Sequence, residues 1–305
     1  MIDRRCSMVP TAPADLRREI ELRLAEAGID SAHQEARWIV QAAAGMTPES
    51  FATAPTVSEE ATRAAVAMAE RRIAGEPLQY VTGVAGFRRL ELSVGPGVFI
   101  PRPETELVAE KAMTVLPPGG TLVDVGTGSG AIALAIADER PDATVFATET
   151  SPDALAWAAR NQRSTGARVQ LILGDLLEAL PSSARGAIDV VVANPPYIGS
   201  DEEDQLPHEV KGFEPHGALF AADDGLSVIR RIATDATSWL KPGGKIVLEI
   251  GSTQEEAVRS LLAEAGYADV AVSRDLAGLP RCAGGTWPGE IERGRPEGNR
   301  EGKGS

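Results

Sequence analysis

The strongest constraint on the fold is an alternation of strand-like and helix-like segments that runs from Thr121 to Ser273. Each parallel pair of strands needs a long crossover connection, so such alternation is typical of a parallel sheet with helices on both faces. The sequence therefore predicts an α/β fold with a doubly wound, mostly parallel sheet. The expected strands are 122–125, 144–148, 169–173, 188–193, 245–250 and 268–273, and the expected helices are 129–138, 152–163, 225–240 and 254–265.

A smaller helical unit precedes this sheet. Apolar residues recur near helical spacing from Ala14 to about Arg72, which predicts three short helices, with Ser58 as one N-cap. Residues 80–94 then alternate around glycines as a β-hairpin would. The role of the helical bundle is either recognition of a partner or plain packing. We expect a disordered leader over 1–13, the helical bundle over 14–79, a hairpin linker over 80–100, the main domain over 101–287 and a disordered tail over 288–305.

Composition excludes some classes of protein. The formal net charge of −14 argues against a protein that grips a nucleic-acid backbone and favours a basic partner, although acidity is also an ordinary route to solubility. No apolar run approaches the length of a membrane span. Cys6 and Cys282 stand far apart in the sequence without metal-like spacing, which is typical of free thiols in a reducing compartment. We therefore expect a cytoplasmic enzyme with no bound metal.

A run of β-branched residues stops abruptly at Asn194, Pro195, Pro196 and Tyr197. The prolines cannot continue a central strand, so they hold Asn194 extended at a strand's carboxyl end, where ligands bind in open parallel sheets. One interpretation is a clamp in which the Asn194 side-chain oxygen and the Pro195 carbonyl accept hydrogen bonds from a planar NH2 group. The other is a strand-terminating turn without chemistry.

A glycine-rich loop follows the first strand of the sheet. Glycine permits positive φ and lets a ligand approach the backbone closely, as a nucleotide-like cofactor requires. The loop spacing, with an acid at Glu149 about twenty residues on, also allows a nicotinamide dinucleotide. The residues of the loop are Gly126, Thr127, Gly128, Ser129 and Gly130.

Three acids favour S-adenosylmethionine instead. Asp124 precedes the glycines, where it suits a cationic amino group and would repel a pyrophosphate. Glu149 ends the second strand and suits two ribose hydroxyls. Asp175 follows the third strand and suits an adenine; a turn or helix cap is the alternative interpretation.

At this point the chain resembles the class I methyltransferases, and among them the HemK/PrmC family of release factor glutamine N5-methyltransferases. The Asn-Pro-Pro-Tyr motif is shared with adenine N6 and ribosomal-protein glutamine methyltransferases, whereas the Pro-Arg-Pro-Glu-Thr-Glu motif narrows the resemblance to this family. The resemblance spans roughly residues 14–283. It is carried by four blocks: Phe99 to Glu106, Asp124 to Gly130, Asn194 to Tyr197, and Phe213 to Gly225.

The resemblance implies a seven-stranded sheet with one antiparallel strand, S-adenosylmethionine as methyl donor, and the glutamine of the Gly-Gly-Gln loop of class 1 peptide chain release factors as acceptor. We further expect that residues 101–287 are the methyltransferase domain, that the bundle recognises substrate, and that the protein is a monomer without direct nucleic-acid or membrane contact. The donor contacts that the resemblance implies are the loop from Gly126 to Gly130, Glu149, Leu176 and Asn194; from the three acids we also expect Asp124 and Asp175 as donor contacts. The acceptor contacts that it implies are Asn194, Pro195, Pro196 and Tyr197, with Phe99 beside the pocket; we also expect Arg102 and Glu104 to contact the substrate.

The sequence departs from the family pattern at two places. Glu149 stands where the family usually has Asp, and residues 281–287 are glycine-rich where the family has an apolar last strand, so the seventh strand is left open. The alternatives to the glutamine activity are an adenine N6 methyltransferase, another protein-glutamine methyltransferase, and a donor-binding regulator that transfers nothing.

Overall fold

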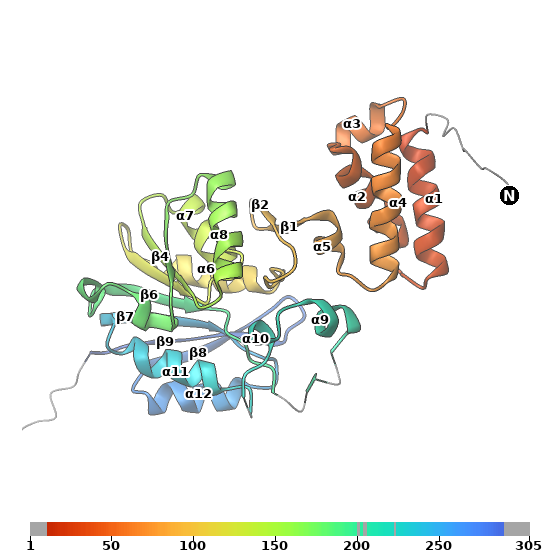
Figure 1. The fold of residues 1–305 in the computed structure, drawn as a ribbon. Coiled ribbons are helices and arrows are strands. Elements are labelled where there is room, and N and C mark those ends of the chain that lie inside the picture. The colour runs from red at the N-terminus through yellow and green to blue at the C-terminus, as the bar shows by residue number, and fades with distance from the viewer. Residues whose placement is uncertain (1–10, 200–201, 204–205, 223, 290–305) are drawn as a thin grey trace, which may run out of the picture. The chain divides into compact units, whose positions relative to one another are not determined.

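The computed structural model describes residues 11–199, 202–203, 206–222 and 224–289 (Figure 1). The chain forms two compact units. The first comprises residues 1–101 and 201–219, and the second comprises residues 102–200 and 220–305. Most of the predicted leader and tail, residues 1–10 and 290–305, lies outside the described residues.

The first unit contains a helical bundle and a short hairpin. Its elements are α1 (Pro13–Glu26), α2 (Ala32–Ala44), α3 (Pro48–Thr53), α4 (Glu59–Ile73), α5 (Leu78–Thr82), β1 (Val84–Phe87), β2 (Leu90–Ser93), α9 (His208–Phe213) and α10 (His216–Leu219). Leu16 and Ile20 of α1 pack with Ile39 of α2 in a closed apolar core. The Ser58 hydroxyl accepts the backbone N–H of Ala61, which confirms that predicted N-cap.

Three expectations for this unit are wrong in detail. The leader ends before residue 13, because Thr11 forms a β-bridge with Val57 and α1 already begins at Pro13. A further short helix, α3, lies between α2 and α4. Residues 78–82 form a helix that ends at a left-handed Gly83, so the hairpin covers only 84–93 and not 80–94. Tyr and Val suit a helix turn as well as a strand, and alternation over so few residues does not separate the two.

The second unit is a seven-stranded sheet, which confirms the predicted fold class. Its strands are β3 (Thr121–Val125), β4 (Thr144–Glu149), β5 (Val169–Leu173), β6 (Ile188–Ala193), β7 (Leu240–Glu249), β8 (Ala268–Arg274) and β9 (Pro280–Thr286). Their order is β5-β4-β3-β6-β7-β9-β8, and only β9 is antiparallel to its neighbours. The chain builds outward from β3 on one side and then from β6 on the other. A topological switch point therefore lies between β3 and β6, where open α/β sheets bind ligands.

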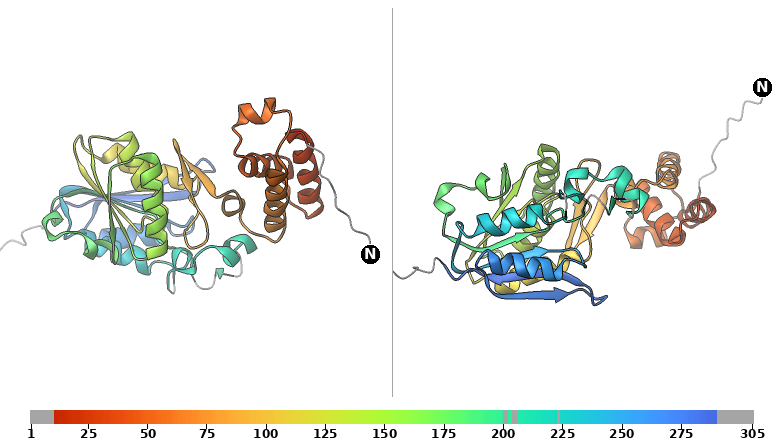
Figure 2. Two further views of the ribbon diagram at one scale, coloured as in Figure 1. Left: turned by 45° about the horizontal axis from the view of Figure 1, so that its top comes forward. Right: turned by 90° about the horizontal axis from the view of Figure 1, so that it is seen from below.

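Helices cover both faces of this sheet (Figure 1, Figure 2). One face carries α6 (Thr105–Val115), α7 (Ala131–Glu139) and α8 (Pro152–Thr165), and the other carries α11 (Ser227–Ala236) and α12 (Glu255–Glu264). The expected helix 225–240 is too long, because Trp239 packs in the core and β7 begins directly after it. The apolar pair Trp239-Leu240 fits the end of a helix as well as the start of a strand, so the sequence alone did not place this boundary.

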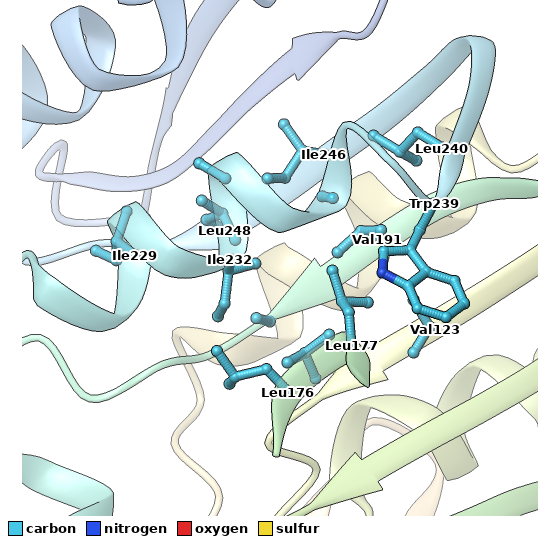
Figure 3. Close-up of a cluster of buried hydrophobic side chains, with 14 of the residues drawn as sticks. Val123, Leu176, Leu177, Val191, Ile229, Ile232, Trp239, Leu240, Ile246 and Leu248 are labelled. Atoms are coloured by element: carbon cyan, nitrogen blue, oxygen red, sulfur yellow. The ribbon is translucent and has the colours of Figure 1, made fainter. Parts of the chain in front are cut away.

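The main core lies between the sheet and α11 (Figure 3). Ile229 and Ile232 of α11 are fully buried there, together with Leu177 of a 3-10 helix η1 (Leu176–Ala179). The sheet contributes apolar side chains from its central strands, including Val123, Val191, Ile246 and Leu248. These strands are fixed by packing below the edge where they end, so the residues that follow them are held on a rigid support.

The seventh strand forms in spite of its glycines. A side chain at Gly284 would stand 3.0 Å from the carbonyl oxygen of Ile246, and one at Gly285 would stand 2.9 Å from Cβ of Tyr267. Glycine is therefore used where β7 and the Tyr267 side chain approach the β9 backbone closely. The predicted seven-stranded sheet with one antiparallel strand is confirmed, with close packing as the reason for the unusual composition.

Candidate active site

Two loops meet at the switch point of the sheet. Val125, the last residue of β3, pairs with Ala193, the last residue of β6. The glycine loop starts at Gly126 and the Asn-Pro-Pro-Tyr motif starts at Asn194, so both motifs leave neighbouring strands at the same edge. The structure thus brings together the two stretches that the sequence singled out.

The glycine loop is a tight turn with open space beside it. Gly126, Gly128 and Gly130 all have positive φ, between 57° and 86°. The backbone N–H groups of Gly126 and Thr127 both donate to the Thr148 carbonyl, at 2.9 and 3.0 Å, which ties the loop to β4. A Cβ added at Gly126 or Gly128 would meet nothing within 4 Å, whereas one at Gly130 would strike Leu134 at 2.8 Å. The first two glycines therefore have open space beside their backbone, which we term the glycine cradle, and the third permits packing against Leu134 of α7.

Asp124 braces this loop from inside. Its Oδ2 accepts the Thr127 hydroxyl at 2.6 Å and the Ala133 backbone N–H at 3.1 Å, and the residue is only 1% exposed. Burial raises the pKa of Asp124 to about 7, against the lowering effect of these two hydrogen bonds. The carboxyl is directed to its own loop, so its predicted contact with a cationic amino group stays a prediction. Ser129 is likewise buried, and its carbonyl accepts a hydrogen bond from Asn161.

Glu149 holds the rim of the same loop. One carboxylate oxygen accepts the Gly128 backbone N–H at 2.9 Å, and the other accepts that of Ser151 at 2.9 Å. A carboxylate oxygen has two lone pairs, so each keeps capacity for one further donor such as a ribose hydroxyl. Glu has one methylene group more than Asp, and this extra length lets the Glu149 carboxylate reach the backbone N–H of Gly128.

Asp175 and Leu176 stand beyond the end of β5. Asp175 is exposed and its Oδ2 accepts from Arg231 at 2.7 Å, so a ligand that used this carboxylate would share it with a guanidinium. Leu176 has a positive φ of 45°, and its side chain is buried in the main core. A ligand contact at Leu176 therefore falls to its backbone.

The amide of Asn194 is oriented by α6. Its Nδ2 donates to the Thr105 hydroxyl at 3.1 Å, and Thr105 is 3% exposed. Because the NH2 group is engaged there, the side-chain oxygen is the atom left to accept from a ligand. Pro195 is buried and Pro196 half-buried.

Both the side chain and the backbone carbonyl of Tyr197 are held by hydrogen bonds. Its hydroxyl donates to Glu249 Oε1 at 3.3 Å, and its carbonyl accepts from Gln254 Nε2 at 2.9 Å. Burial and the charge of Glu249 raise the pKa of Tyr197 above its usual range, so the phenol stays protonated and acts as a donor. A Cβ at Gly225 would stand 2.3 Å from the Tyr197 carbonyl oxygen, so glycine is required beside this turn.

Glu249 and Gln254 are site residues that sequence reasoning missed. Glu249 ends β7, is 1% exposed and has its pKa raised to about 7, chiefly by burial. The signal was an acid at the carboxyl end of an apolar strand, next to the strand that carries Asn194. In the sequence, Thr105 stood out only as one residue of the Pro-Arg-Pro-Glu-Thr-Glu motif and not as a site residue in its own right.

The remaining predicted substrate residues are placed differently. Phe99 belongs to the first unit and is half-buried there. Arg102 and exposed Glu104 belong to the second unit: Arg102 lowers the pKa of Tyr197 by its charge, and Glu104 raises that of Glu249. Arg102 and Glu104 therefore act electrostatically on the Tyr197–Glu249 pair, and substrate contact by all three stays a prediction.

The sheet order, the glycine loop and the motif after β6 define a class I methyltransferase. Residues 15–83 match the model of the PrmC N-terminal domain and residues 96–210 that of the methyltransferase small domain. A crystal structure of a methyltransferase from Pyrococcus furiosus shares the fold, with a TM-score of 0.50 and 21% identity over 66% of this chain and 90% of that chain.

The curated relatives narrow this class. A release factor glutamine methyltransferase of Streptomyces coelicolor is 44% identical over 268 residues, covering 86% of this chain and 93% of the relative. One of Geobacter sulfurreducens is 37% identical over 264 residues, covering 86% and 92%. This chain belongs to the release factor glutamine methyltransferase family. Among the described residues, no helix combines the length and apolarity needed to traverse a bilayer.

Proposed function

We propose that this protein transfers a methyl group from S-adenosylmethionine to the side-chain N5 of the glutamine in the Gly-Gly-Gln loop of class 1 peptide chain release factors. The relatives that carry this name cover most of the chain, and the two motifs of the family converge at one edge of the sheet. The observation that carries the proposal is the engagement of the Asn194 NH2 group with Thr105. It leaves the Asn194 oxygen as an acceptor, which is what a substrate amide NH2 requires.

The donor would be held at the glycine cradle. Open space beside Gly126 and Gly128 admits a ligand against the backbone, and Glu149 has lone pairs for ribose hydroxyls at the rim. Buried Asp124 keeps the loop in this shape. When bound, S-adenosylmethionine supplies an electrophilic methyl carbon on a positively charged sulfur.

The acceptor nitrogen needs help because an amide lone pair is delocalised into its carbonyl. In the proposed clamp, the Asn194 side-chain oxygen and the Pro195 carbonyl accept the two N–H bonds of the glutamine. These acceptors orient the nitrogen and stabilise the positive charge that develops on it as its new bond to carbon forms. As this bond forms, the bond between the methyl carbon and the sulfur would break, which leaves S-adenosylhomocysteine as the product. The nitrogen then releases one proton to solvent; this proton is acidic only after the transfer, so no strong base is needed.

Mass spectrometry of a release factor tests this proposal. After incubation with this protein and S-adenosylmethionine, we expect a mass increase of one methyl group on the glutamine of the Gly-Gly-Gln loop. Asn194→Ala should abolish the transfer while calorimetry shows donor binding mostly intact, because the cradle lies on a different loop. Normal turnover by Asn194→Ala would refute the clamp.

In the same assay, the protein can also be offered other substrates. DNA or RNA added beside the release factor tests for adenine methylation, and labelling of nucleic acid instead of protein would replace the proposed function. Tight donor binding without transfer to any substrate would indicate a regulator. The monomeric state, the cytoplasmic location and the recognition role of the helical bundle stay predictions.

A further inference from the structure

The Asn-Pro-Pro-Tyr turn has few backbone donors with which to hold its own shape. Proline has no backbone N–H, so Pro195 and Pro196 offer carbonyl groups only. The turn is anchored at its start by β6, because Ala193, the last residue of that strand, pairs with the strands on both sides. An anchor for its other end, at Tyr197, has to come from another part of the chain.

A glutamine side chain supplies this second anchor. Gln254 Nε2 donates to the Tyr197 carbonyl oxygen at 2.9 Å, and Gln254 Oε1 accepts the backbone N–H of Gly251 at 2.9 Å. Gln254 is the N-cap residue of α12, and Val258 of the same helix is fully buried in the main core. One carboxamide therefore ties the end of the turn to a helix that is held in place by packing.

Two glycines enclose this carboxamide. A Cβ at Gly225 would stand 2.3 Å from the Tyr197 carbonyl oxygen and 2.8 Å from Gln254 Nε2, and one at Gly251 would stand 3.1 Å from Gln254 Oε1. Gln254 itself is only 8% exposed. Because the backbone closes around the hydrogen bond, solvent has little access to replace it when it is lost.

The chemistry of the two hydrogen bonds selects a carboxamide. The N–H of Gly251 requires an acceptor, and the carbonyl of Tyr197 requires a donor. Glutamine carries both at the end of one side chain, whereas an ionised glutamate of nearly the same shape only accepts. Glutamate at position 254 would therefore place a negative oxygen against the Tyr197 carbonyl oxygen.

Resting on the proposed function, we propose that Gln254 is a positioning residue for methyl transfer. It fixes the far end of the turn whose Asn194 oxygen and Pro195 carbonyl would hold the acceptor NH2, and it acts through this turn and not by contact with the substrate. The Tyr197 hydroxyl, which donates to Glu249 Oε1 at 3.3 Å, gives the same end a second tie. The glycine cradle lies on a different loop, so loss of Gln254 should affect the acceptor and spare the donor.

Gln254→Glu tests the proposal without a change of size. In single-turnover kinetics with a release factor above neutral pH, we expect the rate to fall by roughly tenfold or more, with the donor Kd from calorimetry within about twofold of the wild type. A protonated glutamate has one oxygen that accepts and an O–H that donates, as glutamine does. Lowering the pH should therefore bring the variant back toward the wild type. Glu249, whose pKa is raised to about 7, titrates in both proteins, so their rates are compared as a ratio at each pH.

Gln162→Glu is the matched control. Gln162 Nε2 also donates to a backbone carbonyl, that of Val169, but Val169 begins β5 and so lies at the opposite edge of the sheet. The control should lose stability in thermal melts and regain it at lower pH, while its rate of methyl transfer stays at the wild-type value. Equal rates in the two variants would overturn the positioning role, as would a rate ratio for Gln254→Glu that ignores pH.

A further readout needs no activity. The backbone nitrogen of Ile198 shares a peptide group with the Tyr197 carbonyl, so its nitrogen-15 shift reports on the hydrogen bond that this carbonyl accepts. The shift should move in Gln254→Glu above neutral pH, return as the pH is lowered, and stay unchanged in Gln162→Glu. An Ile198 shift that ignores Gln254→Glu would overturn the anchor. A wild type that methylates no release factor while Ile198 responds in this way would refute only the proposed function.

Discussion

At the scale of single residues, the three acids of the site all hold other parts of the protein in place. Asp124 holds the glycine loop through Thr127, and Glu149 holds the same loop through the Gly128 backbone. Glu249 accepts the hydroxyl of Tyr197. The site is therefore shaped by carboxylates that accept hydrogen bonds from its loops, and its rigidity comes from them.

Replacing Gly128 with Val should damage donor binding specifically. A β-branched residue at a φ of 57° is strained by about 1–2 kcal/mol, and its side chain would occupy the open cradle. Gly166→Val is the matched control, because Gly166 has a φ of 71° and free space at the exposed end of α8. Both variants should lose stability in thermal melts. Calorimetry should show donor affinity reduced roughly tenfold or more for Gly128→Val alone.

The buried acid Asp124 should make stability depend on pH. Its pKa is raised from 3.8 to about 7 in the folded protein, so the folded state binds a proton more tightly than the unfolded chain between these values. This contribution to stability is present in full below about pH 4 and is lost as the pH rises to about 7. In urea titrations, the free energy of unfolding of the wild type relative to Asp124→Asn should fall over this range. Parallel curves for the two proteins would contradict the argument.

At the scale of elements, the exit of β6 depends on Gly225, which lies far from this strand in the sequence. Gly225→Ala would place a Cβ 2.3 Å from the Tyr197 carbonyl oxygen and 2.8 Å from Gln254 Nε2, so it should break the Gln254–Tyr197 hydrogen bond. We expect a lower melting temperature together with a loss of methyl transfer. Gly186→Ala shares the positive φ, at 65°, without any close neighbour, and should melt lower only through backbone strain. Equal activity in the two variants would argue against a role for this turn.

The elements that sequence predicted best are those whose signal is local. The strands β3 to β6 are bounded by turn residues, and their positions were predicted to within a residue or so. The sequence did not decide whether β9 forms. Its glycines are explained by close contacts with Ile246 and Tyr267, which lie elsewhere in the sequence. Glu249 was missed for the same reason, since its hydrogen-bond partner Tyr197 comes from the segment after β6, far away in the sequence. Long-range contacts of this kind leave no periodic pattern.

At the scale of the whole molecule, an ion-pair cluster joins distant parts of the first unit. Arg72 of α4 contacts Glu35 of α2 and Glu209 of α9, each at 2.7 Å. Glu214, 6% exposed, accepts the backbone N–H of Ile100 at 3.1 Å. Residues 206–219 are thus part of this unit although they follow β6 of the other.

Arg72→Met should destabilise the first unit. It leaves the buried carboxylate of Glu35 without its cation, which costs about 3 kcal/mol for a buried pair. Arg63→Met, at the exposed pair with Glu59, should cost less than about 1 kcal/mol. Hydrogen exchange should show faster amide exchange in α2, α4 and α9 for the first variant alone. Unchanged exchange in α9 would mean that the Glu209 contact does not hold it.

The membership of residues 206–219 in the first unit restricts how this protein can be recombined with its relatives. A chimera that imports a foreign segment 11–101 alone would leave Glu209 and Glu214 opposite residues with which they were never matched. A chimera that imports both segments together keeps each pair from one parent. The two stretches, separated by a hundred residues of sheet and helix, are therefore expected to be inherited as one block.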